Sequence, residues 1–96
     1  MGLMDPIRFA GVIRYWNPEK SSGLAVLDIP AEHIRALGGL KQQRVHGSLG
    51  GAPFTSNVMP AGGGRLALSV SKAMLSSTGA AMGDSVDVVI ERVGRD

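Results

Sequence analysis

The sequence contains no cysteine. Disulfide bridges, thiolate nucleophiles and cysteine-ligated metal sites are therefore excluded, and a reducing compartment is expected. No apolar run approaches the roughly 20 residues that a membrane-spanning helix needs, and the first residues carry no apolar signal region. We therefore expect a cytoplasmic protein without a membrane partner.

Aromatic residues are also scarce, at 4% of the chain. The core must therefore be built from aliphatic side chains, and these are mostly β-branched valine and isoleucine, which favour strands. Hydrophobic residues make up 44% and charged residues 19%, which is enough apolar material for a folded chain. A chain of 96 residues has room for one core, so we expect a single domain over residues 1–96.

Charge of one sign is nowhere concentrated along the sequence. The formal net charge is +2 and the ten Lys and Arg residues are spread along the chain. The nearest approach to a cluster consists of Arg35, Lys41 and Arg44. This mild basic excess permits contact with nucleic acid without requiring it, and an ordinary solvated surface is the favoured interpretation.

Period-two alternation of apolar residues predicts six strands. In the first, at 7–16, Ile7, Phe9 and Ile13 alternate with Arg8 and other outward residues. The others are expected at 24–29, 45–49, 54–59, 65–70 and 85–92. Residues 17–23 and 60–64 are rich in turn formers and are predicted to be an exposed loop and a hairpin tip. The Gly-Gly pair at 50–51 supplies the positive φ angles of a tight hairpin.

Two short helices are predicted between these strands. The first begins at Pro30, which a first helical turn tolerates, and stops at Gly38. The second is capped by Ser71 and stops at Gly79. Each helix follows a strand and precedes another, so the chain contains two strand-helix-strand units.

An internal repeat relates the two units at an offset of 41 residues. Inward-facing residues and helix stops are the positions that coincide. The pairs are Leu27 with Leu68, Ile29 with Val70, Ile34 with Leu75, Gly38 with Gly79, Val45 with Val86, and Leu49 with Ile90. We therefore predict a mostly β fold, a small barrel of about six strands and two short helices with a pseudo-two-fold internal repeat.

Several sequence blocks resemble one known family. They are LDIP at 27–30, VHGSLGGAPFTSNVMP at 45–60, LSVSKAML at 68–75 and MGDSVDVVIE at 82–91. Together they resemble the small bacterial domain of unknown function 1905 family, whose fold is a double-split β-barrel related to AbrB, MazE and MraZ. The resemblance implies the same barrel here. Because both halves stand on one chain, a monomer would suffice, although a homodimer stays open.

Trp16 is the most distinctive candidate for ligand binding. It adjoins the loop at 17–23 and lies near Arg14 and Lys20, where it could stack on a base or a ligand ring. The alternative is that it caps an open end of the barrel, and this structural role is favoured. Lys72 is the second candidate, because a cation in the first turn of a helix is unfavourable there unless an anion accompanies it.

Nucleic-acid binding is the alternative that the AbrB relation implies. The cations that would carry it are Arg35, Lys41, Arg44 and Lys72. Fold similarity does not transfer function, so this stays a hypothesis based on analogy.

Catalytic and metal sites have little support. His33 and His46 are the only histidines and have no metal-ligand spacing, and His46 is expected to point to solvent. Asp84 is expected to accept hydrogen bonds within its own turn. We therefore expect no cofactor, and a binding module with a ligand or protein partner is favoured over DNA binding and over an enzyme of unrecognised type.

Overall fold

A computed structural model describes residues 6–16, 24–35, 37, 39 and 41–92. The predicted loop at 17–23, the helix stop at Gly38 and the end of the chain after Arg92 lie outside these residues. The elements in chain order are β1 (Ile7–Tyr15), β2 (Ala25–Ile29), the 3-10 helix η1 (Ala31–His33), β3 (Gln43–Leu49), β4 (Ala52–Gly62), β5 (Arg65–Val70), α1 (Lys72–Thr78) and β6 (Ser85–Arg92).

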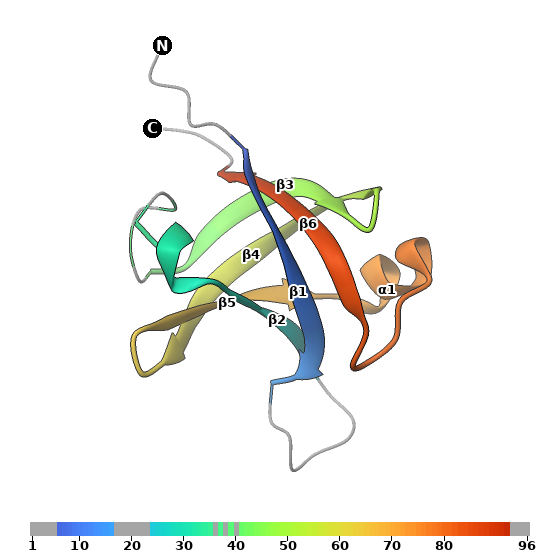
Figure 1. Ribbon diagram of the computed structural model, residues 1–96, viewed down its shortest axis with the longest axis horizontal. Coiled ribbons are helices and arrows are strands. Elements are labelled where there is room, and N and C mark those ends of the chain that lie inside the picture. Colours follow the sequence, from blue (N-terminus) through green and yellow to red (C-terminus); the bar gives the residue numbers. More distant parts are fainter. Residues whose placement is uncertain (1–5, 17–23, 36, 38, 40, 93–96) are drawn as a thin grey trace.

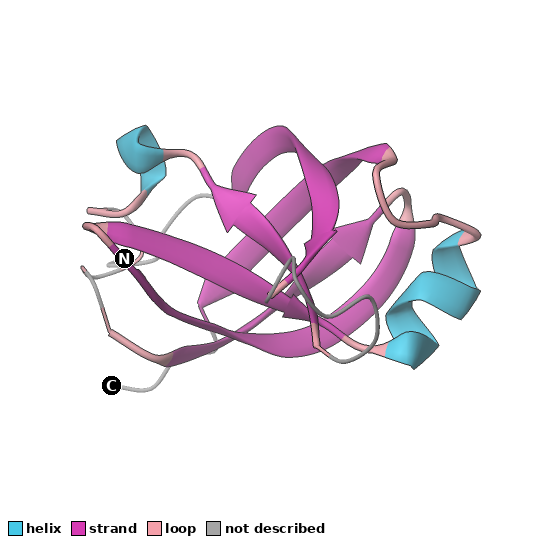
Figure 2. Cartoon of the chain, turned by 90° about the horizontal axis from the view of Figure 1, so that it is seen from below, coloured by secondary structure: helices cyan, strands magenta, loops and turns pink. Residues whose placement is uncertain are grey.

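The six strands form a closed barrel in the order β1-β2-β5-β4-β3-β6, and every neighbouring pair is antiparallel (Figures 1 and 2). Alternate residues of each strand point inward, as period-two patterning requires. The fully buried side chains include Ile13, Leu27, Val45, Leu68 and Ile90. No polar or charged side chain is buried among the described residues. The predicted mostly β barrel is therefore confirmed, while its relation to AbrB stays a prediction.

The strand pairing confirms the internal repeat. β2 pairs with its own counterpart β5, and Leu27 lies directly opposite Leu68. β3 pairs with its counterpart β6, and Ser48 lies directly opposite Val89. Both pairs are 41 residues apart, so a pseudo-two-fold axis passes through the barrel at these two contacts.

The repeat also includes β1 and β4, which the offset of 41 did not reveal. Ile13 pairs with Leu27 as Val58 pairs with Leu68. Phe9 pairs with Val88 as Phe54 pairs with Gly47. These matches relate β1 to β4 at an offset of 45, because the chain from Ile13 to its partner Leu27 is four residues longer than the chain from Val58 to its partner Leu68.

The two helical segments lie at opposite ends of the barrel, as the pseudo-two-fold axis requires (Figure 1). α1 has the predicted cap and stop: the Met74 N–H donates to Ser71 Oγ at 3.2 Å, and Gly79 has a φ of 74°. The first predicted helix is reduced to the single turn of η1. Its N-terminal neighbour Pro30 makes no side-chain capping hydrogen bond, so fewer interactions favour a longer helix there.

The β3–β4 hairpin turns at Gly50 and Gly51, which have φ angles of 57° and 90° as predicted. β4 continues to Gly62, so the expected tip at 60–64 is wrong in extent. Met59 pairs with Ala67 and Pro60 with Leu66, and pairing with β5 therefore overrides the turn preference of this segment.

Among the described glycines, Gly47 is the one whose added Cβ would come closest to another atom. A Cβ atom placed there would overlap the carbonyl oxygen of Val89 on the neighbouring strand. At Gly11, by contrast, an added Cβ would meet only the side chain of Leu27, which can move. β3 and β6 can therefore approach as closely as they do only because residue 47 has no side chain.

We predict that Gly47→Ala lowers the free energy of unfolding by about 3 kcal/mol. The new Cβ would overlap the carbonyl oxygen of Val89, and this backbone atom cannot move without disturbing the ladder between β3 and β6. Urea denaturation followed by circular dichroism measures this change. Gly11→Ala is the matched control and should cost clearly less. Equal losses in the two variants would contradict this account.

Candidate functional site

Three large apolar side chains are exposed among the described residues, and all lie on the outer face of β1 and β2. They are Val12, Trp16 and Leu24, with exposed fractions of 52%, 38% and 43%. Ile13 and Leu27, which point inward, fix this orientation because strand side chains alternate. The backbone N–H of Trp16 donates to the backbone carbonyl of Leu24 at 2.7 Å. This bond joins the end of the first strand to the beginning of the second. We call these three residues the Trp16 surface.

An ion pair lies on the same face. Arg14 Nε is 2.7 Å from Asp28 Oδ2, and Arg14 Nη2 is 2.9 Å from Asp28 Oδ1. Arg14 Nη1 also donates to the Tyr15 carbonyl at 3.1 Å. A bidentate pair of this kind fixes both side chains and cancels their charges locally.

The ion pair lowers the pKa of Asp28. The hydrogen bonds from Arg14 are the largest cause, partial burial opposes them, and the positive charges of Arg14 and then Arg65 act in the same direction as the hydrogen bonds. The carboxylate therefore stays ionised, and its hydrogen-bonding capacity is directed to Arg14. Asp28 is a poor candidate for a general base.

The Trp16 surface has no equivalent in the second half of the barrel. The offsets of 45 and 41 place other residues at the related positions. Val12 and Arg14 of the first half correspond to Asn57 and Met59, and Leu24 and Asp28 correspond to Arg65 and Ser69. A register shift between Pro60 and Gly62 places Gly62 opposite Arg65, so Gly62 takes the position of Trp16. Because both halves complete the same barrel, closure does not require the apolar triplet or the ion pair.

A shallow groove of about 420 Å³ adjoins the Trp16 surface. Its lining consists of Val12, Ile13, Arg14, Tyr15, Met82 and Gly83. The turn before β6 forms one side, because the Gly83 N–H donates to the Ile13 carbonyl at 2.8 Å. Asp84 holds this turn as predicted, since its Oδ2 accepts from the Ala81 N–H at 2.9 Å. The groove is mostly apolar, with Arg14 as its charged member.

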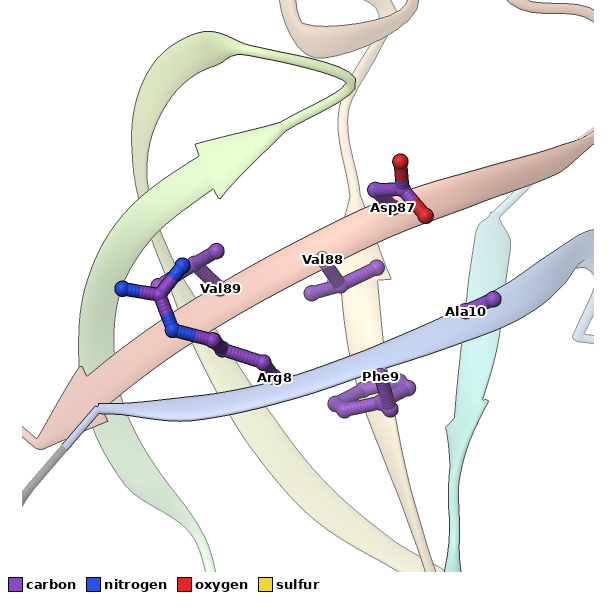
Figure 3. Close-up of a pocket in the computed structure, with 6 residues that line it drawn as sticks. All are labelled: Arg8, Phe9, Ala10, Asp87, Val88 and Val89. Carbon is purple, nitrogen blue, oxygen red and sulfur yellow. The ribbon is translucent and has the colours of Figure 1, made fainter.

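A second groove, of about 390 Å³, lies between β1 and β6 (Figure 3). Arg8 and Asp87 provide opposite charges, and in Figure 3 Arg8 extends toward Val89, away from Asp87. Register places Ala10 opposite Asp87 and Arg8 opposite Val89. This groove is therefore more polar and less continuous with exposed apolar surface than the first.

The residues predicted for ligand binding, Trp16 and Lys72, belong to the same end of the barrel. β1 ends at Tyr15 and α1 begins at Lys72, directly after β5. The β2–β5 register pairs Ala25 with Val70, so the beginning of β2 separates the two residues. Both side chains are exposed.

The four cations predicted for nucleic-acid binding do not form one cluster. Arg35, Lys41 and Arg44 follow η1 or begin β3, whereas Lys72 begins α1 at the opposite end (Figure 1). All four side chains are exposed.

The two histidines lie beside single carboxylates. His46 is exposed as predicted, with Nε2 at 3.5 Å from Glu91 Oε1. His33 is partly buried against Phe9, with ring centroids 5.7 Å apart, and its Nε2 lies 3.7 Å from Glu32 Oε2. In the described part of the chain, His, Asp and Glu side chains nowhere gather in a group of three that could hold a metal ion.

The helices in the described ranges also lack the length and apolar character of a membrane span.

Sequence patterning alone missed Val12, Leu24 and the Arg14–Asp28 pair. The available signal was the position of Val12 among the outward residues of the first strand, where polar side chains are usual. Recognition of the pair required the register that places Arg14 opposite Val26, next to Asp28.

We predict that Asp28→Asn removes part of the acid sensitivity of folding. A carboxylate whose pKa is lowered by folding contributes stability above its unfolded pKa, and this stability is lost as the pH falls through the lower folded pKa. The contribution is small, about 0.5 to 1 kcal/mol, because both side chains are partly exposed. Urea unfolding at pH 7 and at pH 2 to 3 measures it.

The double variant Arg14→Gln/Asp28→Asn is the control for this prediction. It should match Asp28→Asn in its pH dependence, because both variants lack the ionising carboxylate. The stability lost between pH 7 and pH 2 to 3 should be smaller in Asp28→Asn than in the unchanged protein. An equal loss in the two proteins would contradict the assigned role of the pair.

Comparison with known families gives one match. A family model described as Domain of unknown function (DUF1905) matches residues 9–90. The matched residues extend from β1 into β6 and include all of β2, β3, β4 and β5. No curated protein matches the chain.

Proposed function

Because the chain belongs to the DUF1905 family, whose description gives no activity, we propose a function from its surfaces: it is a binding module that recognises an uncharged apolar group through the Trp16 surface. The observation that carries this proposal is the grouping of Val12, Trp16 and Leu24 on one face. Trp16 and Leu24 are neighbours across the strand pair, and Val12 lies beyond Arg14 in the adjoining groove. Exposed apolar residues that share one face mark interaction sites more often than scattered ones do.

The electrostatics of this face favour an uncharged partner group. Arg14 and Asp28 compensate each other through two hydrogen bonds, so neither presents a free charge to a ligand. The planar guanidinium still offers a face on which an aromatic ring could stack. Met82, in the lining of the neighbouring groove, adds a polarisable side chain that suits an aromatic ring.

The groups on this face are suited to binding rather than to reaction. Val12, Trp16 and Leu24 carry no nucleophile or titratable group, and the carboxylate of Asp28 is engaged by Arg14. Trp16 combines a large contact area with few rotatable bonds, which is why tryptophan is enriched at the energetic centres of interfaces. The apolar group bound at this surface is either a small aromatic ligand or an aromatic side chain of a protein partner, since both present the same kind of ring.

We predict that neutral aromatic fragments bind at the Trp16 surface. Titration of the ¹⁵N-labelled protein with indole and with N-acetylphenylalanine amide should shift the amide resonances of Val12, Trp16 and Leu24. Trp16→Ala should weaken fragment binding about tenfold, since an anchor residue would be lost from an exposed position without loss of the core.

Val89→Ala is the matched control, because it truncates a valine in the second groove between β1 and β6. It should leave fragment binding unchanged. Resonance shifts confined to Arg8, Ala10 and Asp87, or the absence of any shift at millimolar fragment, would refute the proposal.

A further inference from the structure

Exposed cations gather at the end of the barrel that carries η1. This end contains the beginnings of β1, β3 and β5, the ends of β2, β4 and β6, and the segment from η1 to β3. Figure 1 shows η1 and the β4–β5 turn on the left and the first residues of β1 at the top, while α1 lies on the right. The exposed cations at this end are Arg8, Arg35, Lys41, Arg44, Arg65 and Arg92, and we call them the basic end.

Barrel topology brings these cations, which are far apart in the sequence, to one end of the barrel. Arg8 is in β1, Arg44 in β3, Arg65 at the first position of β5 and Arg92 at the last position of β6. Antiparallel closure brings these strand ends to one side. Lys72 and Arg14 are the remaining described Lys and Arg residues. Lys72 follows the end of β5 and Arg14 lies near the end of β1, so both are nearer the other end of the barrel.

The acidic residues at this end only partly offset the cations. Asp28 is already paired with Arg14, which is not part of the basic end. Glu32 and Glu91 lie beside His33 and His46. The ion pairs among the described residues are Arg14–Asp28, His33–Glu32 and His46–Glu91, and they include none of the six cations.

We propose that the basic end binds the phosphate backbone of duplex nucleic acid without reading its sequence. Five of the six cations are arginines, whose planar guanidinium groups match phosphate oxygens in a bidentate geometry. None of its six cations belongs to the Trp16 surface, and the inference does not depend on the function proposed for that surface.

The choice of a duplex rests on the positions of the aromatic residues. Recognition of single strands needs exposed rings on which bases stack. The chain has four aromatic residues. Trp16 and Tyr15 belong to the far end of β1, Phe54 is buried, and Phe9 packs against His33. The basic end therefore offers phosphate contacts without a stacking platform.

Fluorescence anisotropy of a labelled random-sequence duplex, measured over a salt series from about 20 to 200 mM, tests this inference. Contact with at least four phosphates gives a slope of log K against log salt of about −3 or steeper. Arg44→Gln should make the slope shallower by about one, and the triple variant Arg44→Gln/Arg65→Gln/Arg92→Gln by about three.

Lys72→Gln is the matched control, because it removes one exposed cation from the opposite end of the barrel. Its salt slope should equal that of the unchanged protein. An equal effect of Lys72→Gln and Arg44→Gln would overturn the assignment, because net charge alone would then explain binding. All variants should keep the circular dichroism spectrum and melting temperature of the unchanged protein.

Competitors identify the class of polyanion. An unlabelled duplex should displace the labelled one, whereas polyglutamate at equal total charge should displace it at least tenfold less effectively. Equal displacement by polyglutamate would replace the proposal with a general acidic partner. Tighter binding of a single strand than of a duplex, or no anisotropy change at the lowest salt, would also overturn it.

Discussion

Closure of the barrel depends on two ladders in which a strand pairs with its own counterpart. β2 pairs with β5 around Leu27 and Leu68, and β3 pairs with β6 around Ser48 and Val89. Together with the β1–β6 and β3–β4 ladders they join the two halves, so each half alone would leave unpaired strand edges. The close approach at Gly47 lies beside one of these contacts, and the buried leucine pair forms the other. Packing at the pseudo-two-fold axis is therefore one of the features that join the two halves.

Most of this fold could be predicted because its determinants are local. Alternation of buried and exposed residues identified the strands, and Ser71 and Gly79 identified the limits of α1. The relation between β1 and β4 was missed because four additional residues after β1 change the repeat offset. The predicted helix at 30–38 was overextended, because helical patterning does not measure how well the first turn is capped. The strand at Pro60 forms through pairing with β5, which is a tertiary effect.

The candidate surfaces were less predictable because they depend on register and topology. Trp16 was identified from its residue type, but Leu24 joins it only through the pairing of β1 with β2. Arg35, Lys41 and Arg44 were grouped by their proximity in the sequence. Arg65 and Arg92 lie at one end with them only because the barrel closes, and Lys72 is separated from them for the same reason. Short-range patterning contains no information about either effect.

Asp28 links the two surfaces electrostatically. Its main partner is Arg14, beside the Trp16 surface, while the positive charge of Arg65, in the basic end, also lowers its pKa. The hydrogen bonds from Arg14 are the largest cause and the charge of Arg65 is the smallest, so a polyanion near Arg65 would change the state of Asp28 only slightly. The two surfaces should therefore act independently, and substitutions on each should have additive effects.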